Sequence, residues 1–256
     1  MSFDTPKRLL ITGATGGIGG ALALEYAGPG IHLWLQGRRE GQLATIALAC
    51  EAKGATVHTE RLDVRDCDAL RRWVSTAGED GLDLIILAAG LNTDIGTAGE
   101  GEQWSNVEAL LDVNVLAVMA SVDAVLPAMR SRKRGQIALF SSLAGWRGLP
   151  ITPSYSASKA AIRVYGEALR DWLEPDGISV NVILPGYVES KMCHEMPGPK
   201  PFLWDAARAA RRIRRGLNAN QARISFPFPL NLGCWLLSVI PQRLSSLILK
   251  WLDYRG

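Results

Sequence analysis

The chain has 256 residues, of which 48% are hydrophobic and 21% are charged, an ordinary globular composition that suits one large α/β domain or two small ones. The 28 basic and 25 acidic residues leave a formal net charge of +3, too small to indicate a nucleic-acid partner. The four cysteines lack C-x-x-C pairing and the three histidines are scattered, so we expect no metal site and no disulfide framework. Reduced thiols, and a front end with no apolar signal-peptide core, favour a cytoplasmic protein.

Six short apolar runs, each typical of a buried strand, alternate with helical patterns along the chain. The runs lie at residues 8–13, 31–37, 56–64, 82–90, 135–142 and 178–186, and the helical patterns include 19–27, 40–54, 104–130 and 155–173. Strands that are apolar on both faces and separated by helices indicate a parallel sheet covered on both sides. With right-handed crossovers this predicts a doubly wound, Rossmann-type α/β fold that binds ligands outside the carboxyl ends of its strands. No linker divides the chain, so we expect a single domain over residues 1–256.

A glycine-rich loop follows the first strand directly and reads Thr-Gly-Ala-Thr-Gly-Gly-Ile-Gly at residues 12–19. Glycine lets the backbone approach a phosphate closely, and the N-terminus of the next helix adds free N–H groups and a partial positive charge. The alternative is a tight turn that only packs the helix on the strand. The place of the loop between a strand and a helix favours a dinucleotide-binding loop.

The end of the second strand distinguishes between two cofactors. NAD-binding folds tend to place an acidic residue there for the ribose 2′-hydroxyl, whereas residues 36–39 read Gln-Gly-Arg-Arg and the first acid is Glu40. Arginine pairs with a 2′-phosphate through two donors at once, so we expect NADP(H) in preference to NAD(H). The alternative is a pair of solvated loop arginines.

Tyr155 and Lys159 lie four residues apart in the run Tyr-Ser-Ala-Ser-Lys, on one face of a predicted helix. Taken alone, the pair is either a solvated edge or an acid whose proton is made labile by a neighbouring ammonium. A free tyrosine titrates near pH 10, so it needs nearby positive charge to act as a base near neutral pH.

Taken in order, the motifs resemble those of the short-chain dehydrogenase/reductase family. They are TGATGGIG at 12–19, Asp63-Val64, AAG at 88–90, Asn114, Ser141-Ser142, YSASK at 155–159 and PGYVES at 185–190. The similarity covers about residues 7–192 and leaves about residues 193–256 as a helical C-terminal lid over the substrate and an apolar tail. It implies NAD(P) binding and the reversible oxidation of an alcohol to a ketone or aldehyde.

The resemblance also implies a role for each matching residue. Tyr155 is the general acid/base, and Ser142, thirteen residues before it, orients the substrate oxygen rather than Ser141. Lys159 holds the nicotinamide ribose and lowers the pKa of the tyrosine, while Asn114 supports a water in the proton relay. The cofactor-binding residues, with Arg38 on the 2′-phosphate, are Gly13, Thr15, Gly17, Ile18, Gly19, Arg38, Arg39, Asp63, Val64, Ala89, Gly90, Tyr155, Lys159, Pro185, Gly186, Val188 and Ser190.

The chain departs from the family pattern in three places. Ala88 and Ala89 stand where asparagine is common, and Ser190 replaces a threonine. After Lys191 the usual final strand is not recognisable, which puts a tetramer built on that strand in doubt. The dimer contact that the family makes through its long helices, here around 104–130 and 155–173, remains, so we expect a homodimer.

The C-terminal tail has patterns of its own. Arginines 208, 211, 212 and 215 fall on one face of a predicted helix, with Leu203, Ala207, Ala210, Ile213 and Leu217 toward the other. Residues 230–240 carry no charge, Pro241 follows, and an amphipathic stripe comprises Leu244, Leu247, Ile248, Trp251 and Leu252. The helices either cap the substrate cleft and pack on the core or a second subunit, or lie peripherally on a membrane surface with the arginines toward anionic headgroups. Either arrangement suggests a hydrophobic substrate, and we expect residues 193–195 to form a loop.

Two other functions remain open at this level. The chain could be a cofactor-binding scaffold or regulator without turnover, although the presence of all four candidate catalytic residues argues against it. It could also be an epimerase or dehydratase with the same tyrosine–lysine chemistry, but such enzymes usually carry a larger substrate domain.

Overall fold

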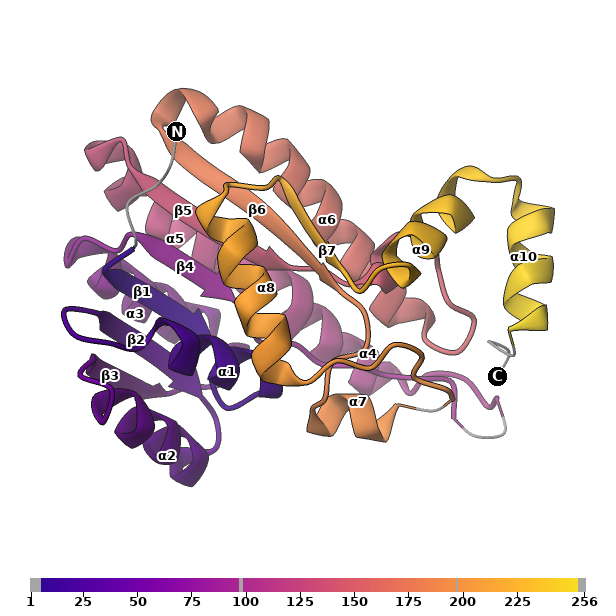
Figure 1. Cartoon of the computed structure of the whole chain (residues 1–256), viewed down its shortest axis with the longest axis horizontal. Helices are drawn as coiled ribbons and strands as arrows, with labels where there is room; N and C mark the ends of the chain where they lie inside the picture. Colours follow the sequence, from indigo (N-terminus) through magenta and orange to yellow (C-terminus); the bar gives the residue numbers. More distant parts are fainter. Residues whose placement is uncertain (1–5, 97–98, 197, 253–256) are drawn as a thin grey trace.

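The chain forms one parallel sheet of seven strands in the computed structural model, which describes residues 6–96, 99–196 and 198–252 (Figure 1). The strands are β1 (Arg8–Thr12), β2 (His32–Gly37), β3 (Thr56–Arg61), β4 (Leu84–Leu87), β5 (Gly135–Phe140), β6 (Ile178–Pro185) and β7 (Arg223–Phe226). They follow the order β3-β2-β1-β4-β5-β6-β7, and each neighbouring pair is parallel. The order reverses between β1 and β4, which opens a crevice beyond the carboxyl ends of these strands. The predicted doubly wound fold is confirmed.

Helices cover both faces of the sheet (Figure 1). One layer contains α1 (Gly17–Tyr26), α2 (Glu40–Glu51) and α8 (Ala206–Asn218), and the other contains α3 (Cys67–Glu79), α5 (Ala117–Arg132) and α6 (Pro153–Leu173). Side chains alternate along each strand, so Leu9 and Ile11 belong to the first layer's core and Leu10 to the second. Because both faces are buried, the central strands read as continuous apolar runs. Short 3-10 turns are η2 (Leu143–Gly145) and η3 (Glu174–Asp176).

The prediction that no final strand follows Lys191 is wrong. β7 pairs in parallel with β6, and its Ile224 and Phe226 are buried in the core. The strand has only four residues and is followed by prolines at 227 and 229, so it is too short to show a periodic pattern.

Helix α8 belongs to the core rather than to a lid. It packs on α1 and β7, and a Cβ on Gly216 would lie 2.7 Å from Cγ1 of Ile224. The predicted arginine face is present, with Arg208, Arg211 and Arg215 exposed. The buried face consists of Ala209, Ala210, Ile213, Gly216 and Leu217. Leu203 and Ala207, which we expected on that face, are exposed, because Leu203 precedes the helix and Ala207 lies in its first turn.

The helix predicted at 104–130 contains an irregular turn. α4 (Trp104–Leu111) continues through the π-helical turn η1 (Asp112–Leu116) into α5. By length and composition alone the run Trp104–Arg132 could cross a membrane, but half of its apolar stretch is buried within the protein. α5 packs on α3 as a core helix of this domain.

A helical hairpin of α9 (Leu230–Val239) and α10 (Gln242–Trp251) stands apart from the sheet beyond β7 (Figure 1). No residue of α9 is buried, and α10 buries only Ser245 and Leu249. Residues 193–195, expected to be a loop, lie in the short helix α7 (Lys191–Glu195). Of the predicted lid, α7 and the α9–α10 hairpin are the parts that border an apolar cavity.

Replacing Ile224 by alanine tests whether β7 belongs to the core. Ile224 has no exposed surface, so we expect the free energy of unfolding to fall by about 2–5 kcal/mol in urea unfolding followed by circular dichroism. Leu247→Ala, at a position that is 59% exposed, should change it by less than about 0.5 kcal/mol. Equally small effects for both variants would contradict the placement of β7.

Candidate active site

A cleft of about 990 Å³, the nucleotide cleft, opens beyond the carboxyl ends of β1, β2 and β4. Of the predicted cofactor-binding residues, those that line it are Gly13, Thr15, Gly17, Ile18, Gly19, Arg38, Arg39, Asp63, Val64, Ala89, Gly90, Tyr155, Lys159, Pro185 and Ser190. Gly186 and Val188 line a second, apolar cavity instead. The N–H of Gly186 donates to the carbonyl of Phe226 at 2.8 Å, which turns this segment toward β7 and α9.

The glycine loop brings bare backbone to the floor of the nucleotide cleft. Gly13 has a φ of 67°, and a Cβ there would lie 2.7 Å from Cα of Ala89. A Cβ on Gly17 would lie 2.7 Å from the carbonyl oxygen of Glu189. No side chain caps the N-terminus of α1, and its first turn has no acidic residue. The helix therefore offers N–H groups and a partial positive charge, which fits a dinucleotide pyrophosphate.

Gln36 is a site residue that the sequence analysis missed. Its buried side chain accepts a hydrogen bond from the Gly13 N–H at 2.9 Å and donates to the carbonyl of Leu62. It thus joins the glycine loop to the residue that precedes Asp63. The available signal was a polar side chain at the end of an otherwise apolar, buried strand.

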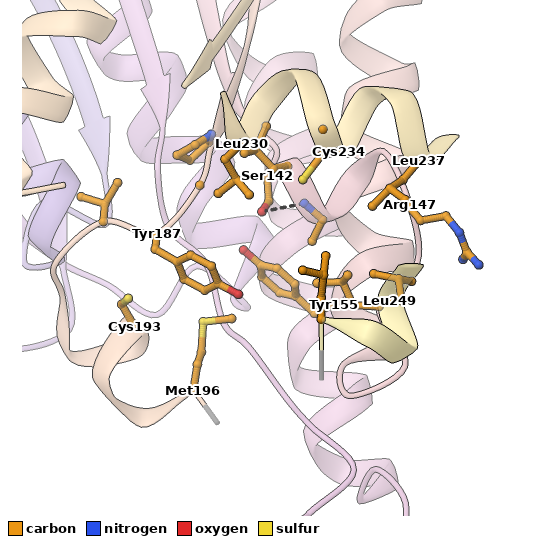
Figure 2. A pocket seen from close by; sticks show the side chains of 18 of the residues that line it. Ser142, Arg147, Tyr155, Tyr187, Cys193, Met196, Leu230, Cys234, Leu237 and Leu249 are labelled. Carbon is orange, nitrogen blue, oxygen red and sulfur yellow. Dashed lines mark hydrogen bonds between the residues drawn. The ribbon is translucent and has the colours of Figure 1, made fainter. Parts of the chain in front are cut away.

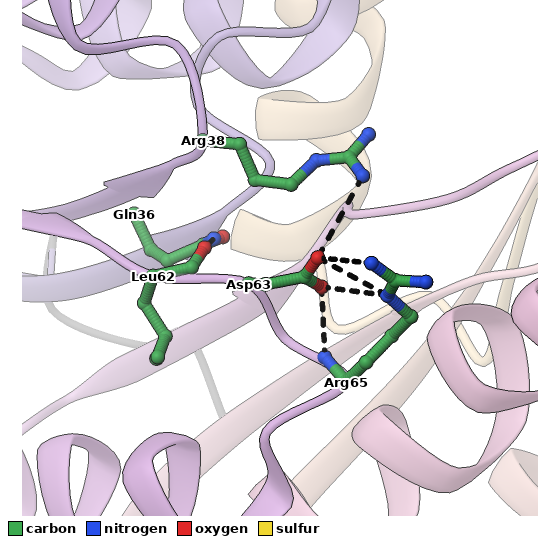
Figure 3. A network of polar contacts seen from close by, with 5 residues as sticks. All are labelled: Gln36, Arg38, Leu62, Asp63 and Arg65. Atoms are coloured by element: carbon green, nitrogen blue, oxygen red, sulfur yellow. Dashed lines mark hydrogen bonds and ion pairs between the residues drawn. The ribbon is translucent and has the colours of Figure 1, made fainter.

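The two predicted phosphate-binding arginines have different surroundings. Arg38 has a side chain that is 55% exposed, and its Nη1 lies 3.9 Å from Oδ2 of Asp63 (Figure 3). Arg65 pairs more closely with Asp63, at 2.7 Å, and its hydrogen bonds hold the pKa of that carboxyl below its ordinary value. Arg39 instead donates to the carbonyl of Thr15 and braces the glycine loop. Of these two arginines in the cleft, Arg38 is therefore the one whose guanidinium has no close hydrogen bond within the described part of the chain.

Tyr155 lies where the nucleotide cleft meets the apolar cavity, and it lines both. Figure 2 shows its side chain at the apolar cavity, together with Ser142. Ser142 lines the apolar cavity only, whereas Lys159 lines the nucleotide cleft only. The hydroxyl of Ser142 forms a hydrogen bond with Tyr155 and accepts one from the Ala144 N–H at 3.2 Å. Ser141 is turned away from the cavity, since its hydroxyl donates to the carbonyl of Lys159 at 2.7 Å.

The electrostatics of this group differ from the sequence-based expectation. Burial raises the pKa of Tyr155, and the hydrogen bond with Ser142 opposes this only in part. Burial also lowers the pKa of Lys159 to about 8. The ammonium of Lys159 donates to the carbonyl of Phe140 at 3.0 Å and lies 5.6 Å from the centroid of the Tyr155 ring. The net effect of the chain's own groups is thus to raise the pKa of Tyr155, and the lowering of this pKa by Lys159 stays a prediction.

Asn114 lies behind the site rather than in it. It is buried in the π-helical turn, where its Nδ2 donates to the Leu91 carbonyl and to Ser158 Oγ, both at 3.0 Å. Its Oδ1 accepts from the Leu91 N–H at 2.8 Å. Asn114 thus joins the loop after β4 to α6, and its part in a proton relay stays a prediction. Single π-helical turns inside α-helices are frequent at functional sites.

The apolar cavity has a volume of about 400 Å³. Its walls come from η2, the 185–190 turn, α7 and the α9–α10 hairpin, with Leu143, Met192, Met196, Leu237 and Leu249 among them. Besides two cysteines, the polar side chains among the described lining residues are Ser142, Arg147, Tyr155, Tyr187 and Ser190. Figure 2 shows the hydroxyl ends of Tyr155 and Tyr187 on the same side of the cavity, and Arg147 directed away from them. Tyr187 was not predicted, although it lies inside the PGYVES motif.

Comparisons with known proteins agree with this geometry. The sequence model of the short chain dehydrogenase family matches residues 7–199. The chain belongs to the short-chain dehydrogenase family. It is 37% identical, over 95% of its own length and 95% of the relative's, to an uncharacterized oxidoreductase of Myxococcus xanthus.

Solved structures of short-chain dehydrogenases share its fold. One from Sphingobium yanoikuyae in complex with NADPH has a TM-score of 0.80 at 23% identity, covering 93% of this chain and 94% of that one. Another from Mycobacterium paratuberculosis, bound to NAD, has a TM-score of 0.77 at 22% identity, covering 88% and 97%. The family makes the protein an NAD(P)-dependent oxidoreductase. Within the described residues, no group of three His, Cys, Asp or Glu side chains could hold a metal ion.

The lowered pKa of Lys159 predicts a pH-dependent stability of this dehydrogenase. The pKa falls from 10.5 to about 8 on folding, so the unfolded chain binds more protons between these pH values and the free energy of unfolding rises with pH across that window. We expect a gain of about 3 kcal/mol relative to Lys159→Met, which lacks the titrating group. Urea unfolding of both proteins without nucleotide at several pH values measures the difference. A constant difference from pH 7.5 to 10.5 would contradict the buried ammonium.

Proposed function

We propose that this dehydrogenase uses NADP(H) to interconvert a ketone or aldehyde and an alcohol on a hydrophobic substrate, with Tyr155 as the acid/base. The observation that carries the proposal is the position of Tyr155, which lines both the nucleotide cleft and the apolar cavity. A group at this boundary reaches a substrate oxygen on one side while a cofactor occupies the other.

Each residue at the boundary has a distinct task in the proposed reaction. Ser142 and Tyr155 hold the carbonyl oxygen, and the Tyr155 hydroxyl donates a proton to it in reduction or accepts one in oxidation. When bound, the nicotinamide supplies the hydride exchange. The raised pKa of Tyr155 keeps the phenol protonated near neutral pH, which is the form that carbonyl reduction requires. Lys159, still cationic at neutral pH, serves the ribose from the nucleotide side.

The preference for NADP(H) rests on the end of β2. Arg38 faces the cleft and is only loosely paired with Asp63 at 3.9 Å, so its guanidinium can turn to a 2′-phosphate. Gly37 has no room for an acidic side chain, because a Cβ there would lie 2.5 Å from Cγ2 of Thr15. The carboxylate that would favour NAD(H) has no place at this position.

The assembly and location that we propose follow from the remaining surface. Five exposed apolar side chains lie on the helices that family dimers use, and they support a homodimer: Trp104, Leu111, Leu116, Val164 and Trp172. All four cysteines are thiols, which supports a reducing compartment such as the cytoplasm.

Tyr155→Phe tests the proposed acid/base. We expect kcat to fall by about 10²- to 10⁴-fold while NADPH affinity stays within about twofold, because only the proton-transferring hydroxyl is lost. The assay follows NADPH absorbance with a panel of apolar ketones and aldehydes, and titration calorimetry measures NADPH binding. Tyr165→Phe is the matched control and should keep its turnover, because Tyr165 is on the same helix α6 but lines neither the nucleotide cleft nor the apolar cavity. Unchanged turnover in Tyr155→Phe would remove the assignment, and a wild type inactive on every substrate would favour a scaffold.

Arg38→Leu tests the cofactor preference. Loss of a charge-assisted hydrogen bond of about 1.5–3 kcal/mol should raise KM for NADPH by roughly 10- to 150-fold and leave KM for NADH nearly unchanged. Arg61→Leu is the control, since Arg61 pairs with Glu40 at 3.3 Å and does not line the cleft. A wild type that works equally well with NADH, or equal effects of Arg38→Leu on both cofactors, would overturn the preference.

A further inference from the structure

The α9–α10 hairpin is apolar on both of its sides. On α9, Leu230, Cys234 and Leu237 line the cavity at helical spacing. Three other residues of α9, Leu232, Trp235 and Val239, form a second stripe that is 42–59% exposed and does not line the cavity.

Helix α10 repeats this arrangement. Leu249 lines the cavity and is buried, whereas Leu244, Leu247 and Trp251 are 53%, 59% and 84% exposed. Burying one such side chain is worth about 1.5–3 kcal/mol, so two adjacent exposed stripes of this kind mark an interaction surface. We call these six exposed residues of α9 and α10 the outer face of the hairpin.

Charge indicates what covers the outer face. Residues 230–252, which contain the hairpin, have no aspartate or glutamate, and their two cations, Arg243 and Lys250, are exposed beside the apolar stripes. Tryptophan and leucine next to cations, without carboxylates, are typical of helices that lie in the interface of an anionic bilayer. Asp253 comes next in the sequence and lies outside the described residues.

A second copy of the chain fits the outer face less well. A two-fold contact through this surface would bring together cations of both protomers with no carboxylate from residues 230–252 to pair with them. An anionic lipid surface attracts the same cations, at about 1 kcal/mol for each one near the surface.

The mouth of the cavity lies on this same hairpin. Leu236, Ile248 and Leu252 line the cavity and are themselves 43%, 39% and 41% exposed, so they form its rim. We propose that the outer face docks on an anionic lipid bilayer and that the cavity receives its substrate, an apolar ketone or alcohol dissolved in that bilayer, through this rim. The docking stands on the surface alone, and the identity of the substrate rests on the proposed function.

The test is co-sedimentation of the full-length protein with phosphatidylcholine vesicles, with and without phosphatidylglycerol. We expect binding to the anionic vesicles that weakens at high salt. The double variant Trp235→Ser/Trp251→Ser should bind at least 10-fold more weakly, whereas Leu48→Ser, which removes a 67% exposed leucine on α2, away from the hairpin and from the proposed dimer helices, should bind as the wild type does. Arg243→Gln and Lys250→Gln should each weaken binding by about fivefold. Circular dichroism checks that every variant is folded.

Three outcomes overturn the docking: no binding of the full-length protein to anionic vesicles, equal losses in Leu48→Ser and the double variant, or binding without regard to lipid charge. Sedimentation velocity without vesicles tests whether a second copy of the chain occupies the outer face instead. A lower oligomeric state in the double variant alone would assign the outer face to a second copy. Activity separates docking from chemistry. In the double variant, KM for a vesicle-dissolved ketone should rise, while KM for a short water-soluble ketone should stay the same. A protein that binds vesicles but is inactive on both ketones would contradict the proposed function and leave the docking intact.

Discussion

Helix α6 is held against the carboxyl end of β5 by two hydrogen bonds of a single residue, Lys159, and the geometry of the site depends on this attachment. Ser141 donates to the Lys159 carbonyl at 2.7 Å, and Lys159 Nζ donates to the Phe140 carbonyl at 3.0 Å. Gly145 allows the approach, since a Cβ there would lie 2.9 Å from the Lys159 carbonyl. The segment after β5 and helix α6 each contribute one hydroxyl to the cavity, Ser142 and Tyr155, and this attachment brings Ser142 to where it lowers the pKa of Tyr155.

The same attachment separates two environments. On the nucleotide side, the cleft offers a helix N-terminus without a cap and a loosely paired arginine. On the other side, the cavity is walled by leucine, methionine and the hairpin, with its hydroxyls near one end. Desolvation by that apolar wall raises the pKa of Tyr155, and burial on the cleft side lowers that of Lys159. Both groups are thereby kept closer to their neutral forms than they would be in water.

The features that the sequence predicted well depend on local geometry. Buried parallel strands leave long apolar runs, a glycine loop directly follows its strand, and a tyrosine and lysine four residues apart share a helix face. The features that it missed depend on contacts between distant segments. β7 is too short to show a pattern. Gln36 owes its role to a hydrogen bond with Leu62, which directly follows β3, and Gly186 lies at the cavity because its N–H is bonded to the carbonyl of Phe226. The pKa of Tyr155 follows from burial, which spacing along the chain does not reveal.

Gly37 has a consequence for how this chain could change its cofactor. A carboxylate for the ribose 2′-hydroxyl would be introduced at the end of β2, but any Cβ at position 37 meets Cγ2 of Thr15 at 2.5 Å. Threonine is branched at Cβ and has little rotamer freedom with which to move aside. An acid at position 37 is therefore expected to fit only alongside a smaller residue at position 15, so the effects of the two substitutions should not be additive.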